Sequence, residues 1–283
     1  MINFNADRTL FSLELFPPKD TESLVSIYAS MGRFKSVKPD YISVTYGAGG
    51  SDNHETVSIA SDIKNKFGIE SIAHLTCAGS TKQNIDKALE ALKNGGVNNI
   101  LALRGDKSVE LSEFKYATDL ISYINDYGGF EVCATCYPEG HKESINIEED
   151  FDVLKKKADL GVTHFISQLF FETSDFENML EGMARRNIKV PAIAGIMPVT
   201  SAKQIMRMLK LSGARMPEKL GIILNRFESD KDAVRAAGIN YAINLITELL
   251  AINVPGIHLY VMNNPDTAEI IHRAINPLLN KSI

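Results

Sequence analysis

Short apolar runs alternate with helix-like segments along the whole chain, and this alternation limits the possible folds more than any other feature. Each run ends in glycine, proline or polar residues, as expected of strands that are buried on both faces of a parallel sheet. The segments between the runs repeat apolar residues every three or four positions, which is typical of helices. The predicted strands are residues 9–16, 41–45, 71–76, 99–103, 130–136, 164–168, 190–196 and 256–261.

Helices are predicted between these strands, so that strand–helix units recur at roughly thirty residues, the period of a (β/α)8 barrel. The predicted helices are residues 21–36, 54–66, 81–94, 116–127, 147–160, 174–186, 201–211, 231–252 and 266–275. We therefore predict an α/β fold, a (β/α)8 TIM barrel, with a loop over 217–230 and an extra helix before the eighth strand. A doubly wound sheet is the alternative, but neither G-x-G-x-x-G nor G-x-x-x-x-G-K-[ST] occurs, and the glycine-rich residues 47–50 have the wrong spacing.

Composition and charge set the class of protein. Residues 1–283 contain no linker or low-complexity segment, so a single domain is predicted. With 45% hydrophobic and 23% charged residues, the chain can bury a large core. A net charge of −5 gives no basic surface for nucleic acid or an acidic membrane. No apolar run approaches the ~20 residues of a membrane span, and no signal peptide is recognisable, so we expect a cytoplasmic protein.

Polar side chains recur at the carboxyl ends of the predicted strands, where the active sites of such barrels lie. Singly, each has a structural explanation: Glu14 could pair with a lysine or arginine of the barrel, and His74 could be a hydrogen-bonded core histidine. Together they predict a ligand site, because clustered buried polar groups need a ligand or a mutual network. The strand-end residues are Glu14, Thr45, His74, Arg104, Asp106, Tyr137, Gln168 and Pro198.

Three cysteines, Cys77, Cys133 and Cys136, are too few for a disulfide framework. Cys133 and Cys136 form a C-x-x-C pair, a spacing that in other settings binds metal or carries out dithiol chemistry. On a strand, however, a spacing of three places two side chains on opposite faces. We therefore expect core cysteines and no metal site.

Six short segments stand at or near the ends of the predicted strands. They are Ser12-Leu-Glu-Leu-Phe-Pro-Pro-Lys19, Ser43-Val-Thr-Tyr-Gly-Ala48, Ala73-His-Leu-Thr-Cys77, Leu101-Ala-Leu-Arg-Gly-Asp106, Tyr137-Pro-Glu-Gly-His141 and Gly195-Ile-Met-Pro198. In this order and spacing they resemble the bacterial, catalytic-domain type of methylenetetrahydrofolate reductase, and the resemblance covers essentially the whole chain. In that family a (β/α)8 barrel binds FAD without a Rossmann domain, which agrees with the missing glycine fingerprint.

The resemblance implies an FAD-dependent oxidoreductase of one-carbon metabolism and methionine biosynthesis. In a ping-pong reaction a donor would pass hydride to FAD and leave, and 5,10-methylenetetrahydrofolate would then be reduced to 5-methyltetrahydrofolate. Glu14 matches the family's general acid, which helps to open the imidazolidine ring, and Asp106 matches the acid beside the flavin. An apolar environment raises the pKa of carboxyl groups in general, which suits proton donation near neutral pH. The implied substrate contacts are Glu14, Asp106, Gln168, Gln204 and Met208.

The resemblance also implies a set of FAD-binding residues. They are Thr45, Tyr46, His74, Arg104, Gly105, Asp106, Tyr116, Ala117, Tyr137, His141, Asp150, Lys156 and Lys157. Asp150, Val153, Lys156 and Lys157 are expected to share one face of the helix over 147–160. The lysines at 155–157 could instead be a solvated charge run.

Three departures from the family pattern concern binding, and chiefly the hydride donor. Val153 stands where relatives have asparagine, Met208 replaces a stacking aromatic residue, and Asn264 replaces an arginine. FAD and folate recognition should persist, whereas reduction by NADH should be weak. The donor is therefore expected to be NADH or NADPH, or a protein such as a ferredoxin or a second subunit, and the chain is expected to act as a homo-oligomer or in a hetero-complex.

Two other functions remain open at this stage. The chain could be a different barrel flavoenzyme, similar to proline dehydrogenase, or a non-catalytic flavin- or folate-binding subunit of a larger complex. Glu14 and Asp106 argue against the second, because a subunit without chemistry has no need of an acid in an apolar strand. The chain ends at Ile283, soon after the last predicted helix. We therefore expect no inhibition by adenosylmethionine, for which animal and yeast relatives carry a C-terminal region.

Overall fold

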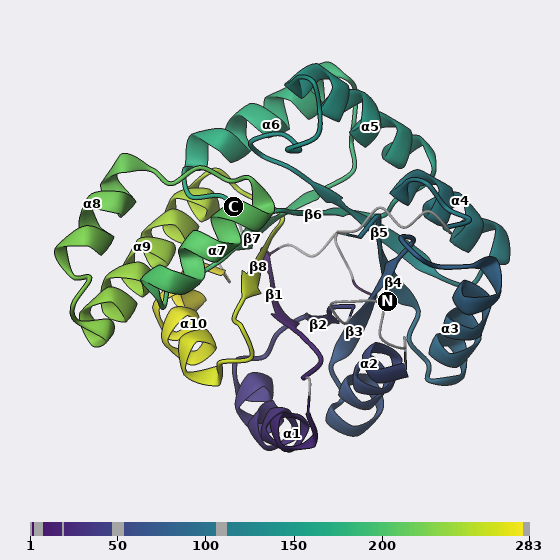
Figure 1. Cartoon of the computed structure of the whole chain (residues 1–283), viewed down its shortest axis with the longest axis horizontal. Coiled ribbons are helices and arrows are strands. Elements are labelled where there is room, and N and C mark those ends of the chain that lie inside the picture. The colour runs from purple at the N-terminus through teal and green to yellow at the C-terminus, as the bar shows by residue number, and fades with distance from the viewer. Residues whose placement is uncertain (1, 3–7, 19, 47–53, 106–111, 280–283) are drawn as a thin grey trace.

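Eight parallel strands close into a barrel in the order of the sequence, which confirms the predicted fold (Figure 1). The computed structural model describes residues 2, 8–18, 20–46, 54–105 and 112–279. Glycine-rich residues 47–50 and Asp106, both singled out above, lie outside these ranges. The strands are β1 (Leu10–Leu15), β2 (Tyr41–Val44), β3 (Glu70–Thr76), β4 (Asn99–Leu103), β5 (Glu131–Cys136), β6 (Phe165–Ser167), β7 (Ala192–Ile196) and β8 (Gly256–Tyr260).

Helices surround the barrel and cover its outer face (Figure 1). In the described residues they are α1 (Thr21–Ser36), α2 (His54–Phe67), α3 (Lys82–Asn94), α4 (Ala117–Tyr127), α5 (Ile147–Asp159), α6 (Thr173–Arg185), α7 (Ala202–Ser212), α8 (Glu218–Arg226), α9 (Lys231–Ala251) and α10 (Pro265–Leu279). The excursion before β8 is confirmed. In the described residues no helix is long and apolar enough to cross a membrane.

The prediction of a loop over 217–230 was wrong, because helix α8 lies within it. Pro217 occupies the N-cap position of α8, with φ −62° and an extended ψ, where the missing N–H of proline costs nothing. Leu220 and Leu224, four residues apart, are buried in a cluster with Val234 of α9. Pro217 therefore marks the start of a helix within the segment that was predicted as a loop.

Alternation along the strands sorts side chains between the inside and the outside of the barrel. On β1, Phe11, Leu13 and Leu15 belong to the large core that packs against the helices. Ser12 and Glu14 therefore point into the barrel, above Leu10, which belongs to the small inner cluster. Polar side chains thus enter the barrel interior near the carboxyl ends of the strands.

The cysteines lie where the strand spacing predicts. Cys133 belongs to the inner cluster and Cys136 to the outer core, on opposite faces of β5. Burial raises the pKa of the Cys136 thiol to about 12, so this group is an inert core thiol. Within the described residues no cluster of His, Cys, Asp or Glu side chains suits a metal ion.

Candidate functional site

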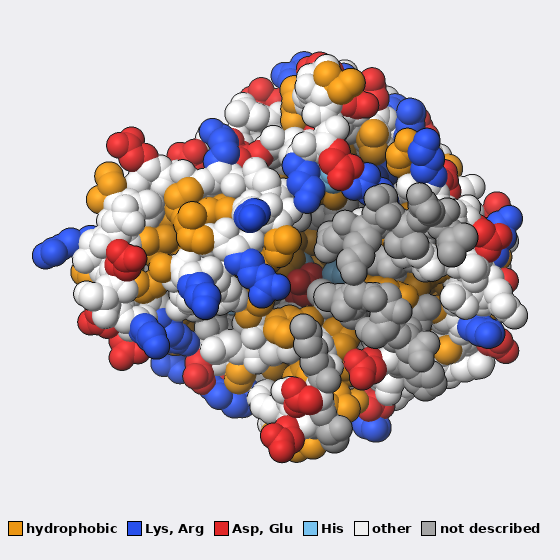
Figure 2. Space-filling view, in the orientation of Figure 1, with side chains coloured by type: hydrophobic (Ala, Val, Ile, Leu, Met, Phe, Trp, Pro, Cys, Tyr) orange, Lys and Arg blue, Asp and Glu red, His pale blue; other side chains and the backbone are white. Residues whose placement is uncertain are grey.

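A cavity of about 970 Å³ opens at the carboxyl ends of the strands. Cavities that hold small molecules and cofactors span roughly 300–1,000 Å³, so this one is large enough for an extended ligand. Figure 2 shows the hollow near the middle of this face, with an acidic and a histidine side chain visible in its depth. The residues expected at the site that line it are Glu14, Thr45, Tyr46, His74, Arg104, Gly105, Tyr137, His141, Gln168 and Met208.

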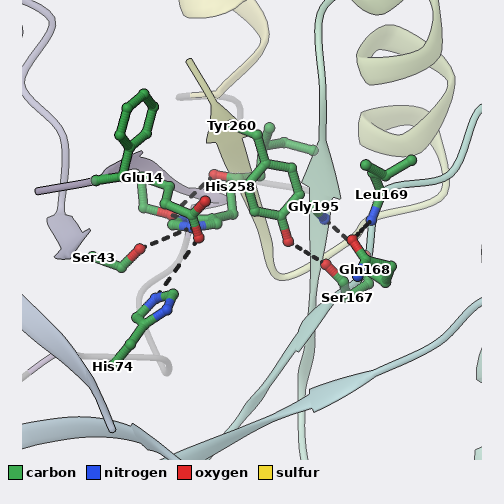
Figure 3. Close-up of polar contacts among 12 residues, drawn as sticks. Glu14, Ser43, His74, Ser167, Gln168, Leu169, Gly195, His258 and Tyr260 are labelled. Carbon is green, nitrogen blue, oxygen red and sulfur yellow. Dashed lines mark hydrogen bonds and ion pairs between the residues drawn. The ribbon is translucent and has the colours of Figure 1, made fainter. Parts of the chain in front are cut away.

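Glu14 lies at the floor of this cavity with only 21% of its side chain exposed. Its Oε2 atom lies 3.7 Å from Nε2 of His74 and 3.9 Å from Nε2 of His258 (Figure 3). The Glu14 carboxyl group thus faces two imidazoles rather than the lysine or arginine that its position in a strand allowed. Burial lowers the pKa of His74 to about 4, although the charge of Glu14 opposes that shift. His74 is therefore a neutral neighbour of the carboxyl group near pH 7.

His258 was not among the expected site residues, yet it is the most firmly held side chain beside Glu14. Its Nδ1 lies 2.8 Å from Oγ of Ser12, and its Nε2 lies 3.2 Å from Oγ of Ser43. All three residues are fully buried. The ring also stacks on Tyr41, with centroids 5.8 Å apart. Strand register explains the cluster, because Ser12 on β1 pairs with both Tyr41 and His258.

Tyr260 was also missed, and it closes the other side of the floor. Its ring meets the His258 ring edge-on at 5.4 Å, and its hydroxyl donates a 2.5 Å hydrogen bond to the carbonyl of Ser167 (Figure 3). Burial raises the pKa of Tyr260 well above its ordinary value, so the hydroxyl stays a donor. Gly195 makes this possible, because a Cβ there would lie 2.5 Å from the Tyr260 hydroxyl.

Backbone turns after β3 and β4 form one wall of the cavity. Gly105 has φ +93°, and a Cβ there would lie 3.1 Å from the Cβ of Ala78. The Arg104 carbonyl accepts a 2.8 Å hydrogen bond from the Ala78 N–H. The Arg104 guanidinium donates a 2.6 Å hydrogen bond to the Glu143 carboxylate. A glycine is required at this corner, and it lets a ligand approach the backbone closely.

The loop after β5 forms the adjoining wall. His141 packs edge-on against Tyr137, with ring centroids 4.7 Å apart. Asp150 of α5 accepts hydrogen bonds of 2.6 Å from the His141 N–H and from the Ser144 hydroxyl. Asp150 therefore shapes the loop from behind instead of lining the cavity.

Lys157 supports the same wall from inside the protein. It is buried, its Nζ donates a 2.8 Å hydrogen bond to the Thr135 carbonyl, and it lies 6.0 Å from the centre of the Tyr137 ring. Burial lowers the pKa of Lys157 to about 8. Lys156 is exposed, so the expectation that it shares the face of Asp150 and Lys157 was wrong. Lys156 lies six residues, or more than one and a half turns, beyond Asp150, and its side chain is therefore on a different side of the helix.

A family model described as methylenetetrahydrofolate reductase matches residues 2–276. The chain belongs to this family. It is 34% identical to "Methylenetetrahydrofolate reductase (NADH) 1" of Arabidopsis thaliana, over 90% of this chain and 46% of that protein. It is 30% identical to "5,10-methylenetetrahydrofolate reductase" of Escherichia coli, over 92% of this chain and 88% of that protein. The chain thus spans about half the length of the plant relatives and most of the bacterial one, and the family resemblance is confirmed.

A solved structure supports the fold. An uncharacterized protein from Clostridium thermocellum that binds two copies of 5-methyl-5,6,7,8-tetrahydrofolic acid superposes with a TM-score of 0.72. The two share 14% sequence identity, and the match covers 97% of this chain and 96% of the other. Oxaloacetate acetylhydrolase also matches, with a lower TM-score of 0.54. At these identities the likeness concerns the barrel alone.

Other residues that the reductase resemblance brought forward lie elsewhere in the structure. Gln204 lies in the first turn of α7, where its N–H is capped by the Ser201 hydroxyl at 3.4 Å. Tyr116 and Ala117 lie at the start of α4, where Tyr116 is 49% exposed and its N–H bonds to Asp119 at 2.9 Å. None of these three is among the lining residues described for the cavity.

Two of the departures from the reductase pattern have structural explanations. Asn264 caps α10, because its Oδ1 accepts a 3.0 Å hydrogen bond from the Thr267 N–H. Met208 of α7 does line the cavity, as expected. Gln168 lines it too, although its Oε1 accepts a 2.9 Å hydrogen bond from the neighbouring Leu169 N–H (Figure 3). Val153, the third departure, lies half-buried on α5.

Proposed function

We propose that this chain reduces 5,10-methylenetetrahydrofolate to 5-methyltetrahydrofolate, with FAD as the hydride carrier. The observation that carries the proposal is Glu14, a carboxyl group inside the barrel at the floor of the cavity, set between two imidazoles. Bacterial relatives that carry the name 5,10-methylenetetrahydrofolate reductase match over most of their length. The family model described as methylenetetrahydrofolate reductase, which matches residues 2–276, supports a folate as the substrate.

The residues of the cavity suit FAD. Its walls combine the flat rings of Tyr137 and His141, the cation of Arg104 and the close backbone approach at Gly105. Among the described residues the buried Nε2 of His74 finds no hydrogen-bond partner, and such an atom is costly unless a ligand uses it. FAD, when bound, supplies a two-electron carrier that accepts hydride from one reactant and gives it to another. The residues proposed to hold it are Thr45, Tyr46, His74, Arg104, Gly105, Tyr137 and His141.

Glu14 is proposed to act as the general acid. Its proton would go to the folate nitrogen that leaves the bridging methylene group, so that the five-membered ring opens to an iminium ion. The iminium carbon can then accept a hydride. Tyr260 and Gln168 line the cavity beside Glu14 and would position the pterin through hydrogen bonds. General acid catalysis is typically worth ~10²–10⁴-fold in rate.

The hydride donor is proposed to use the same cavity before the folate does, in ping-pong order. A second cavity in the described residues, of about 280 Å³, is lined by residues of α8 and α9 together with Phe171 and Phe227. Met208 offers a polarizable surface in place of an aromatic ring, and Asn264 is engaged in capping α10. We therefore propose that the reaction with NADH is weak, or is replaced by reduction through a protein donor such as a ferredoxin or a second subunit.

Visible spectroscopy of the purified protein, followed by anaerobic mixing with methylenetetrahydrofolate, tests this function. A flavin spectrum that is bleached by dithionite and restored by the folate is the expected result. A yellow protein whose reduced flavin ignores the folate would favour another barrel flavoenzyme, similar to proline dehydrogenase. A colourless protein that takes up no FAD on reconstitution would favour a non-catalytic subunit.

A further inference from the structure

A single arginine joins three segments of the chain beside the cavity. Arg215 lies between α7 and α8, and its backbone N–H and its Nε each donate a 2.9 Å hydrogen bond to Oε2 of Glu139. Its Nη2 donates a 2.6 Å hydrogen bond to Oδ1 of Asp175, in the first turn of α6. Glu139 belongs to the loop over 137–146, between β5 and α5. These three residues are called the Arg215 clasp below.

The clasp connects two parts of the cavity lining. The loop over 137–146 contributes Tyr137 and His141, which are proposed to hold FAD. Helix α7 contributes Met208, a proposed folate contact, and Leu211. Because Arg215 follows α7 directly and bonds to the loop, its contacts set the distance between the part of the lining proposed for FAD and the part proposed for the folate.

The loop and the helix differ in how firmly other contacts hold them. The loop is fixed from behind, because Asp150 of α5 accepts hydrogen bonds of 2.6 Å from the His141 N–H and from the Ser144 hydroxyl. The end of α7 is tied to the loop by Lys142, whose exposed Nζ donates a 3.0 Å hydrogen bond to the Leu211 carbonyl. Loss of the clasp should therefore loosen α7 and leave the loop in place.

The clasp adds little to the stability of the fold. The side chains of Glu139 and Asp175 are only 10% and 14% exposed, whereas that of Arg215 is 66% exposed. Burial raises the pKa of both carboxyl groups, and the contacts with Arg215 offset only part of the rise. The folded state thus holds a proton on each group more strongly than the unfolded chain does, so stability falls as the pH rises through their titration. Ion pairs with this balance fix an arrangement more than they stabilise it.

We propose that Arg215 is a positioning residue: its bonds to Glu139 and Asp175 hold α7 at the distance from the FAD-binding loop that the folate requires. This inference rests on the proposed function, because it needs FAD and the folate to share the cavity. Arg215 is not among the lining residues described for the cavity. It therefore acts on the reaction through α7, without contact with either ligand.

Arg215→Met tests the proposal in the full chain, loaded with FAD, reduced by dithionite and mixed anaerobically with increasing 5,10-methylenetetrahydrofolate. A misplacement of about 1 Å can cost up to ~100-fold, and we expect the folate concentration for half-maximal reoxidation to rise about tenfold, because Lys142 still ties α7 to the loop. The maximal rate should change less than about twofold, since packing on α7 binds the folate equally before and during the reaction. A parental half-maximal concentration would overturn the proposal.

Arg33→Met is the matched control. Arg33 of α1 is exposed and also bridges two carboxylates, with hydrogen bonds of 2.9 Å to Glu269 and 2.5 Å to Asp266 of α10. It lies on the outer helices, so its loss should leave the half-maximal folate concentration unchanged. An equal rise in both variants would mean that any lost ion pair loosens the barrel, and it would also overturn the proposal.

A second variant separates position from unpaired charge, because Arg215→Met leaves two carboxylates without their cation. The triple variant Glu139→Gln/Asp175→Asn/Arg215→Met removes the charges and keeps the volumes, a replacement that is often neutral or stabilising. It should unfold at the parental urea concentration or higher and still need about tenfold more folate.

A parental half-maximal concentration in the triple variant would overturn the proposal, because the clasp would then be dispensable for position. FAD affinity, measured by fluorescence titration, should stay parental in all these variants, since Asp150 still holds the loop. Loss of FAD affinity in the triple variant would mean that the clasp holds the loop instead of α7. A parent chain whose reduced flavin ignores the folate would overturn the proposed function, and this inference with it, so the two failures are distinguishable.

Discussion

Replacement of Gly195 by alanine should damage both the barrel and the site. The new Cβ would lie 2.2 Å from the Ser167 carbonyl oxygen and 2.5 Å from the Tyr260 hydroxyl, so the tyrosine must move. Loss of its hydrogen bond to Ser167 costs about 1 kcal/mol, and overpacking of a buried site costs typically 1–3 kcal/mol. We therefore expect the free energy of unfolding to fall by about 2–4 kcal/mol.

Urea denaturation of the parent chain and the variant measures this loss as a lower midpoint with an unchanged slope. Gly32→Ala is the matched control. Gly32 lies in α1 and a Cβ there meets nothing within 4 Å, so the variant should gain roughly 0.5–1 kcal/mol from helix propensity. Folate-driven flavin reoxidation should slow in Gly195→Ala alone, since Tyr260 leaves its place over His258. Parental stability and rate in Gly195→Ala would refute the structural role of this glycine.

Three further expectations follow from the site. Lys157 has its pKa lowered from 10.5 to about 8, which corresponds to roughly 3 kcal/mol. The unfolded chain binds more protons between these values, so the stability difference between the parent and Lys157→Met should grow in favour of the parent from pH 8 to 10.5. A stability difference that stays constant with pH in urea denaturation would contradict this expectation. Gly105→Ala should weaken FAD binding measured by fluorescence titration, because its φ of +93° costs about 1–2 kcal/mol in a residue with a Cβ. Gly128→Ala, also at positive φ but with nothing within 4 Å of the added Cβ, should leave the affinity unchanged. NADH at micromolar concentration should bleach the flavin slowly in stopped-flow mixing, and rapid bleaching would refute the proposed donor preference.

The parts of the site that the sequence predicted are those at strand ends. Glu14 and His74 lie near the carboxyl ends of β1 and β3, and Arg104 and Tyr137 directly follow β4 and β5. Barrel closure brings such positions together whatever their distance in sequence. The strand–helix alternation was strong enough to predict the barrel for the same reason. Neither inference needs the register of one strand against the next.

The parts that were missed depend on register and on packing behind the barrel wall. His258 lies in the middle of β8, and only its pairing with Ser12 on β1 places it under Glu14. Alternation of inward and outward positions along β8 would have shown that His258 and Tyr260 share the inner face. Lys156 was misplaced because a run of lysines does not reveal which side chain turns inward. In the structure Lys157 turns inward, and its Nζ donates to the Thr135 carbonyl. Helix α8 was missed because residues 217–230 were assigned to a loop, whereas Pro217 stands at the N-cap position of the helix.

Anaerobic single-turnover mixing of the dithionite-reduced, FAD-loaded chain with 5,10-methylenetetrahydrofolate tests most directly whether Glu14 is the acid of a folate reductase. The parent chain should recover its flavin absorbance while 5-methyltetrahydrofolate forms in equal amount. Glu14→Gln should retain FAD, because the amide fills the same volume, but should recover its absorbance ~10²–10⁴-fold more slowly, because it has no proton to give. Reoxidation of Glu14→Gln at the parental rate, or a parent chain whose reduced flavin does not respond to the folate, would contradict the proposed function.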